Sequence, residues 1–125
     1  MKKEAKWQTI LNQYLRESKL YGFFELKQTD KDYLLFSKIE KHQIVGLQAT
    51  ELGGLVWKLS DQDTRQKPCD TLSIPPLPSY LVIFFTDTFY MVRIGEIIKL
   101  MASGQKSISR ENAKLLAEKI IKCQK

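Results

Sequence analysis

Apolar residues recur along this chain with two spacings, one typical of helices and one typical of strands. Intervals of three and four residues between Trp7 and Leu15 predict a helix that packs one side on a core and ends before Gly22. A second helix is expected to begin at a capping box formed by Ser37 and Glu40 and to end near residue 52. Alternating or continuous apolar runs predict strands at residues 23–29, 54–60, 69–74, 79–85 and 89–94.

Helical spacing returns after the last of these strands. A short helix is predicted at residues 96–102 and another from Ser109, with Ala113, Leu116 and Ile120 on its inward side. An exposed basic link at residues 103–107 joins them. The predicted order of elements gives one α/β domain over residues 1–125, with a mixed central β-sheet flanked by α-helices.

The strand at residues 23–29 carries the first candidate chemistry. Because side chains alternate along a strand, Glu25 and Lys27 share one face while Phe24 and Leu26 point to the other. A carboxylate there could hold a hard divalent cation, and the nearby amine could position an attacking water or offset developing negative charge. The alternative is that the pair forms the solvated side of a half-buried strand, where such pairs contribute little.

Two more polar residues lie in apolar surroundings. Gln43 falls on the largely apolar face of the second predicted helix, where it either bonds a neighbouring backbone group or reaches back to the strand of Glu25. Asp70 shares a strand face with Leu72 and Ile74, and an unpaired acid is costly to bury there. It either closes the preceding loop through its own backbone or supplies a second carboxylate to a metal site.

The charge balance and the cysteine count bear on partners and surroundings. The chain has 20 Lys and Arg against 14 Asp and Glu, a net charge of +6 that suits a polyanion such as nucleic acid. Cys69 and Cys123 make no disulfide framework, and with His42 as the only histidine a zinc site is not expected, so a cytoplasmic setting is favoured. The apolar run at residues 80–85 is too short to span a bilayer, so no membrane partner is expected.

These features, in this order, resemble the PD-(D/E)xK nuclease superfamily, most closely the Holliday-junction resolvases of the RecU type. The matching segments are residues 24–29, Phe36, residues 42–44, a glycine-led strand, the hairpin at Phe89 and Tyr90, and residues 104–108. The resemblance implies a restriction-endonuclease-like core. In that family an aspartate strand precedes the E-x-K pair, and nothing between Leu20 and Phe24 supplies it. We therefore expect a permuted or migrated active-site strand that brings Asp70 beside Glu25.

The resemblance also implies roles for individual residues. Glu25, Asp70 and the carbonyl of Leu26 would bind Mg²⁺, with Mn²⁺ as an alternative cation. Lys27 would be the catalytic lysine, and Gln43 would support the site from its helix.

Further roles are implied for the first helix and for basic residues. Glu4 would complete the metal site, unless Gln8 on the same helix edge takes that position. Four basic residues either contact the DNA backbone or form a solvated face: Lys58, Arg65, Lys67 and Lys106.

The expected function is therefore a magnesium-dependent endonuclease that cleaves phosphodiesters of branched or linear DNA, as a homodimer if it follows the resolvases. Two other functions stay open on the same fold, a non-catalytic nucleic-acid-binding module and a protein-interaction domain. Removal of the metal or of Glu25 distinguishes them, because only the nuclease depends on either for its activity.

Overall fold

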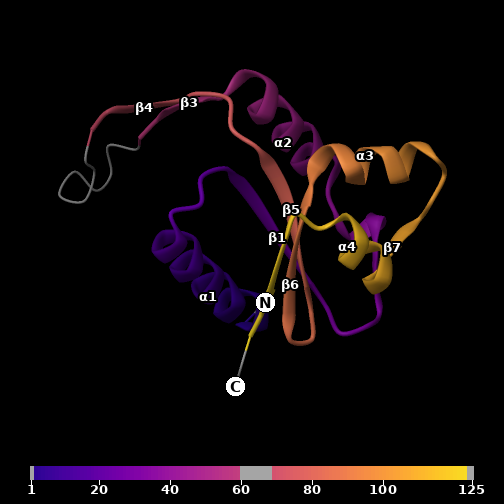
Figure 1. Cartoon of the computed structure of the whole chain (residues 1–125). Coiled ribbons are helices and arrows are strands. Elements are labelled where there is room, and N and C mark those ends of the chain that lie inside the picture. Colours follow the sequence, from indigo (N-terminus) through magenta and orange to yellow (C-terminus); the bar gives the residue numbers. More distant parts are fainter. Residues whose placement is uncertain (1, 60–68, 124–125) are drawn as a thin grey trace.

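The computed structural model describes residues 2–59 and 69–123, with side chains from residue 6 onward. Helices flank a central mixed sheet, so the protein has a mixed α/β fold (Figure 1). The elements in chain order are α1 (Lys2–Ser18), β1 (Phe23–Thr29), β2 (Tyr33–Leu35), the short 3₁₀ helix η1 (Phe36–Lys38), α2 (Lys41–Gly53), β3 (Leu55–Lys58), β4 (Thr71–Ile74), β5 (Ser79–Phe85), β6 (Thr88–Arg93), α3 (Ile94–Ala102), β7 (Ser107–Ser109), α4 (Arg110–Leu116) and β8 (Lys119–Lys122).

The central sheet has the strand order β1-β5-β6-β8, with β1 at one edge. Strand β1 runs parallel to β5, and the pairs β5–β6 and β6–β8 are antiparallel. The register places Glu25 opposite Leu81 and Lys27 opposite Ile83. The backbone amide of Phe23 donates to the carbonyl of Pro78 at 2.9 Å, so β1 and β5 start side by side.

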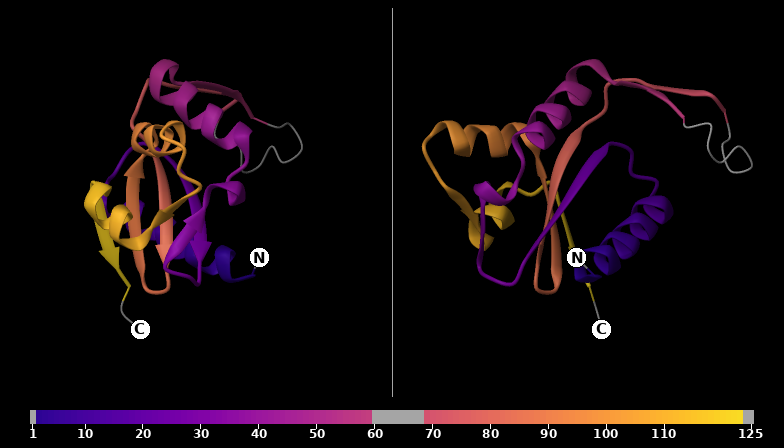
Figure 2. Two further views of the ribbon diagram at one scale, coloured as in Figure 1. Left: turned by 90° about the vertical axis from the view of Figure 1, so that its right-hand side faces the viewer. Right: turned by 180° about the vertical axis from the view of Figure 1, so that it is seen from behind.

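Helices lie on both sides of this sheet (Figure 2), and an apolar core covers each of its two faces. On one face, Leu11 of α1 packs with Leu26 of β1 and with Phe84 of β5. On the other face, α2, α3 and α4 pack against β5 and β6, with Ile83 and Tyr90 in the buried cluster. Because alternate residues of β1 point to opposite faces, Glu25 and Lys27 lie on the side of α2, away from α1.

The start of α2 differs from the prediction. Ser37 lies in η1, and the backbone is extended at Ile39 and Glu40, so Ser37 and Glu40 do not form the expected capping box. The box is formed instead by Glu40 and Gln43, whose side chains each accept from the other residue's backbone amide. The Ile39 side chain is buried in the core, and this burial keeps its backbone extended. The extended segment therefore separates the 3₁₀ turn from the helix that follows.

The C-terminal segment was predicted wrongly as a continuing helix. Helix α4 ends at Leu116, and Ile120 lies in β8, opposite Tyr90 of β6. Pairing with β6 gives the backbone of β8 a hydrogen-bonded partner, and neighbouring β-branched isoleucines favour a strand. The link predicted at residues 103–107 likewise runs into β7, which pairs with β2.

Strands β3 and β4 form a separate hairpin that extends away from the central sheet (Figures 1 and 2). Leu55 lies opposite Ile74 and Lys58 opposite Thr71. Gly54 starts the hairpin with a φ of 76°, and a Cβ at this position would collide with the carbonyl oxygen of Ile74. The hairpin therefore leaves the body of the protein at a turn that requires glycine.

None of the helices in the described segments has both the length and the apolar character that crossing a lipid bilayer requires.

Candidate functional site

Glu25 and Lys27 form an ion pair on the face of β1 that looks towards α2. The Nζ atom of Lys27 lies 3.8 Å from Oε2 of Glu25. The Lys27 side chain is 17% exposed and the Glu25 side chain 30%, so the pair is partly shielded from water. Leu26 between them is buried in the core beneath α1. The prediction that the acid and the base share a face is confirmed, whereas their chemical roles stay predictions.

Gln43 joins this pair from the first turn of α2. Its side-chain amide donates to Oε2 of Glu25 at 2.8 Å. Its amide oxygen accepts from the backbone N–H of Glu40 at 3.2 Å, as part of the capping box. Both alternatives left open by the sequence therefore occur together, since one amide bonds a neighbouring backbone group and also reaches the Glu25 strand.

This double attachment fixes the orientation of the Gln43 amide and, through it, of the Glu25 carboxylate. Gln43 sits at the N-terminal end of α2, where the helix dipole favours a nearby negative charge. Besides the positive end of this dipole, the ammonium of Lys27 places a second positive charge near the same carboxylate oxygen of Glu25. The arrangement is a preorganised carboxylate beside an amine, at the edge strand of the sheet.

A carboxylate oxygen and a main-chain carbonyl oxygen are ligand types that suit a hard cation held by few protein ligands. In the described part of the chain, no three His, Cys, Asp or Glu side chains group closely enough to hold a metal ion together. Mg²⁺ is often bound by one or two protein carboxylates and keeps several waters. Glu25 and the main-chain carbonyl of Leu26 would be its ligands here, because the leucine side chain carries no ligand atom and only its backbone oxygen can take part.

The expected pairing of the Asp70 strand with the Glu25 strand is wrong. Asp70 is exposed and immediately precedes β4, whose partner is β3, whereas β1 pairs with β5. The backbone carbonyl of Asp70 accepts from the amide of Leu59 at 2.8 Å, which extends the hairpin. Two strands close in sequence meet at a small entropic cost, so β4 is held in this hairpin instead of joining the sheet.

The first helix covers the opposite face of the sheet from Glu25. Its apolar stripe, which includes Trp7 and Leu11, packs on the core shared with Leu26. Gln8 donates to Asn12 at 2.9 Å within the helix. The side chain of Glu4 lies outside the described residues, so its role as a ligand stays a prediction.

Of the four basic residues expected to contact the DNA backbone, the two that the structure describes, Lys58 and Lys106, lie on neither β1 nor α2. Lys58 is exposed on the β3–β4 hairpin, away from the central sheet. Lys106 is exposed just before β7, and its carbonyl accepts from the amide of Phe36 at 2.9 Å. Arg65 and Lys67 lie outside the described residues.

A second polar cluster, which the sequence did not suggest, forms near the start of β5. Arg93 lies 3.0 Å from the Glu51 carboxylate and 3.3 Å from the Glu118 carboxylate. Glu51 also accepts from the backbone amide of Ser79 at 2.8 Å. Burial raises the pKa of Tyr80, and the hydrogen bond that the Tyr80 hydroxyl donates to Glu118 raises it further. These residues come from α2, β5, β6 and the segment between α4 and β8, so no spacing in the sequence could have indicated them.

Comparison of this chain with protein-family models, with curated proteins and with solved structures finds no match.

Proposed function

We propose that the protein is a magnesium-dependent endonuclease that cleaves DNA phosphodiesters, with Glu25, Lys27 and Gln43 at its active site. The proposal depends above all on one observation, the 2.8 Å hydrogen bond from Gln43 to the carboxylate that also pairs with Lys27. These three residues belong to the two segments in which the sequence resembles the PD-(D/E)xK nucleases. Their convergence from β1 and α2 brings together the acid, the lysine and the helix residue that the resemblance implies for such a site.

Each residue has a separate task in this proposal. Glu25 and the carbonyl of Leu26 would hold the cation, which when bound lowers the pKa of a coordinated water and polarises the scissile phosphate. Lys27 orients the attacking water or offsets the negative charge that develops on the phosphate. Gln43 is a positioning residue, because its amide bonds both Glu25 and the backbone of Glu40 and so limits rotation of the carboxylate.

The net charge of +6 supports a nucleic-acid substrate, because cationic proteins gain binding energy when they displace counterions from phosphates. Branched DNA and a homodimer that cuts two strands symmetrically belong to the same proposal through the resemblance to the RecU-type resolvases. Linear DNA is the matched substrate against which a preference for junctions is measured.

A non-catalytic nucleic-acid-binding module is the second candidate. The position of Asp70 on the β3–β4 hairpin favours it, because Glu25 then has no second carboxylate from that strand. Such a module binds DNA with a steep salt dependence, and its binding requires neither Mg²⁺ nor the Glu25 charge.

A cleavage assay on junction and linear DNA, with Mg²⁺ or with EDTA, tests both candidates. The wild type should cleave with Mg²⁺ only, and Glu25→Gln and Lys27→Met should each lower the rate at least about a hundredfold. Lys38→Ala is the control, because it removes an exposed lysine on η1. Cleavage that survives Glu25→Gln refutes the proposed site. Binding without cleavage, which persists in EDTA and in Glu25→Gln, assigns the protein to the non-catalytic class.

A further inference from the structure

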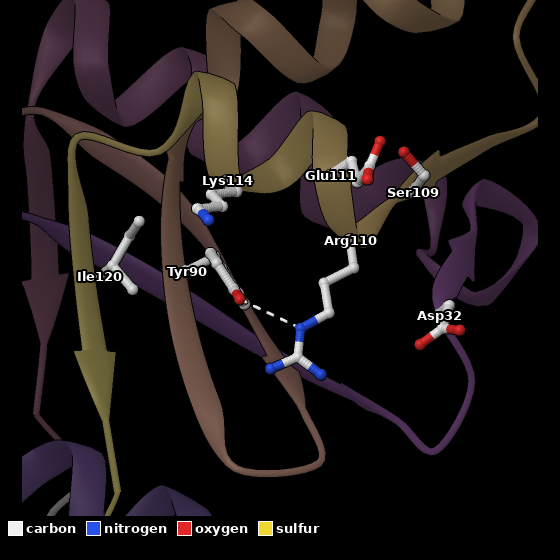
Figure 3. A pocket seen from close by; sticks show the side chains of 7 residues that line it. All are labelled: Asp32, Tyr90, Ser109, Arg110, Glu111, Lys114 and Ile120. Atoms are coloured by element: carbon white, nitrogen blue, oxygen red, sulfur yellow. Dashed lines mark hydrogen bonds between the residues drawn. The ribbon is translucent and has the colours of Figure 1, made fainter.

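A cavity of about 650 Å³ opens beside α4 and the sheet strands β6 and β8 (Figure 3). Tyr90 of β6 and Ile120 of β8 form one wall, and Arg110 and Lys114 extend towards Tyr90 from α4. The two basic residues are four positions apart, so they share one face of the helix. None of the residues Glu25, Lys27 and Gln43 lines this cavity.

Arg110 is held rigidly at the cavity. Its Nε donates to the Tyr90 hydroxyl at 3.1 Å, its Nη1 to Thr86 at 3.3 Å and its Nη2 to the Asp87 carboxylate at 2.9 Å. The hydrogen bond to Tyr90, together with Asp87, raises the pKa of the guanidinium, which therefore stays charged. A guanidinium has five N–H groups, so two remain after these three bonds.

Two further donors at the cavity have no acceptor within the described segments. The Tyr90 hydroxyl accepts from Arg110, but a phenol can also donate one proton, and that proton is not taken up by any described residue. The residue is only 5% exposed, so little water reaches it. Lys114 makes no ion pair in the described part of the chain. Unused donors and a fixed cation therefore converge beside Tyr90.

Acidic groups also line the cavity. The Asp32 side chain lies on the far side of Arg110 from Tyr90 (Figure 3), and Glu111 follows Arg110 on α4. Neither carboxylate has a partner within the described residues. They repel a bare polyanion but accept hydrogen bonds from hydroxyl or amino groups. A ligand for this cavity therefore needs an anionic end and a part that carries hydrogen-bond donors.

We propose that this cavity binds a nucleoside monophosphate, either free or as the phosphorylated end of a nucleic-acid strand. The phosphate accepts from Lys114, from the Tyr90 hydroxyl and from the remaining Arg110 donors, which are the groups that commonly contact phosphate oxygens. The sugar hydroxyls and the base amino group donate to the two carboxylates, and the base lies against Ile120. This inference does not depend on the proposed nuclease activity, because it uses none of the residues assigned to that site.

Isothermal titration of the full chain in EDTA tests the proposal, with deoxyadenosine monophosphate, inorganic phosphate and deoxyadenosine as separate probes. The monophosphate should bind saturably and more tightly than phosphate, and the nucleoside should bind at least about tenfold more weakly than its monophosphate. Equal affinity for the nucleoside and the monophosphate overturns the proposal, as does the absence of saturable binding.

Variants identify the groups involved. Lys114→Ala should weaken binding of the monophosphate about tenfold or more, and Tyr90→Phe should weaken it about fivefold with an unchanged circular dichroism spectrum. Lys38→Ala removes the same charge outside the cavity and should change the affinity less than about twofold. Equal losses in Lys38→Ala and Lys114→Ala would show a nonspecific charge effect and overturn the proposal.

A last titration separates the two sources of the phosphate. A short DNA strand with a 5′-phosphate that displaces the monophosphate, while its unphosphorylated counterpart does not, assigns the site to strand ends. Failure of the phosphorylated strand to compete assigns it to the free nucleotide. Displacement by both strands to the same extent would overturn the proposal, because the site would not then read a terminal phosphate.

Discussion

The side-chain amide of Gln43 donates a 2.8 Å hydrogen bond to the carboxylate of Glu25, 18 positions earlier in the chain. The same amide caps the first turn of α2 through the backbone N–H of Glu40. One side chain therefore joins the start of a helix to the face of an edge strand, and it orients the acid of the candidate site.

Gln43→Ala should lower the free energy of unfolding by about 1.5–3 kcal/mol, because it removes half of a capping box and a hydrogen bond to a charged group. Urea denaturation measures this change. Gln48→Ala is the matched control on an exposed position of α2 and should stay within about 0.5 kcal/mol of the wild type. Equal effects in the two variants would contradict the structural role given to Gln43.

Glu51→Ala should destabilise the protein by about 1–3 kcal/mol. The backbone amide of Ser79, which is fully buried, loses its acceptor at 2.8 Å and cannot be solvated. The ion pair with Arg93 adds less, because that side chain is 35% exposed and water screens the charge. Chemical denaturation gives the value, and Glu111→Ala, an exposed acid without a partner in the described residues, is the control. A loss as large in the control would mean that general charge, not the Ser79 contact, is responsible.

Asp70→Asn should change DNA cleavage, or DNA binding if cleavage is absent, by less than about twofold. The reason is that its strand pairs within the β3–β4 hairpin and not with β1. Rates or affinities measured beside those of Glu25→Gln test this directly. A loss in Asp70→Asn comparable with that in Glu25→Gln would restore the migrated-strand arrangement that the fold argues against.

Asp87 should make part of the stability of the protein sensitive to acid. Hydrogen bonds from the Thr88 hydroxyl and next from Arg110 hold the pKa of this carboxyl below its usual value. A depressed pKa in the folded state gives a stabilisation that is present above the unfolded value, about 3.9, and is lost as the pH falls through the folded value.

Urea denaturation at about pH 6 and about pH 3 tests this linkage. The wild type should lose more of its free energy of unfolding between these values than Asp87→Asn does. Asp30→Asn, at an exposed acid without a partner in the described residues, should follow the wild type. A steeper loss in Asp87→Asn than in the wild type would reverse the sign argued here.

Features that depend on neighbours within one element could be predicted from the sequence. The two-residue period of a strand was enough to put Glu25 and Lys27 on one face with Leu26 opposite. The helix from Ser109 begins as expected, because the Ser109 hydroxyl accepts from the backbone amide of Asn112 at 3.1 Å. The pattern of the β5–β6 hairpin was likewise sufficient to place both strands.

Which segments pair with one another was decided only by the tertiary structure. The sequence allowed Asp70 beside Glu25, but its strand pairs within the hairpin, and the segment around Ile120 forms β8 because β6 offers it backbone partners. The spacing of apolar residues shows which side chains of a segment share a face, because the backbone geometry of neighbouring residues fixes that spacing. The choice of partner is a competition between distant strands for hydrogen bonds and buried area, and no local pattern contains its outcome.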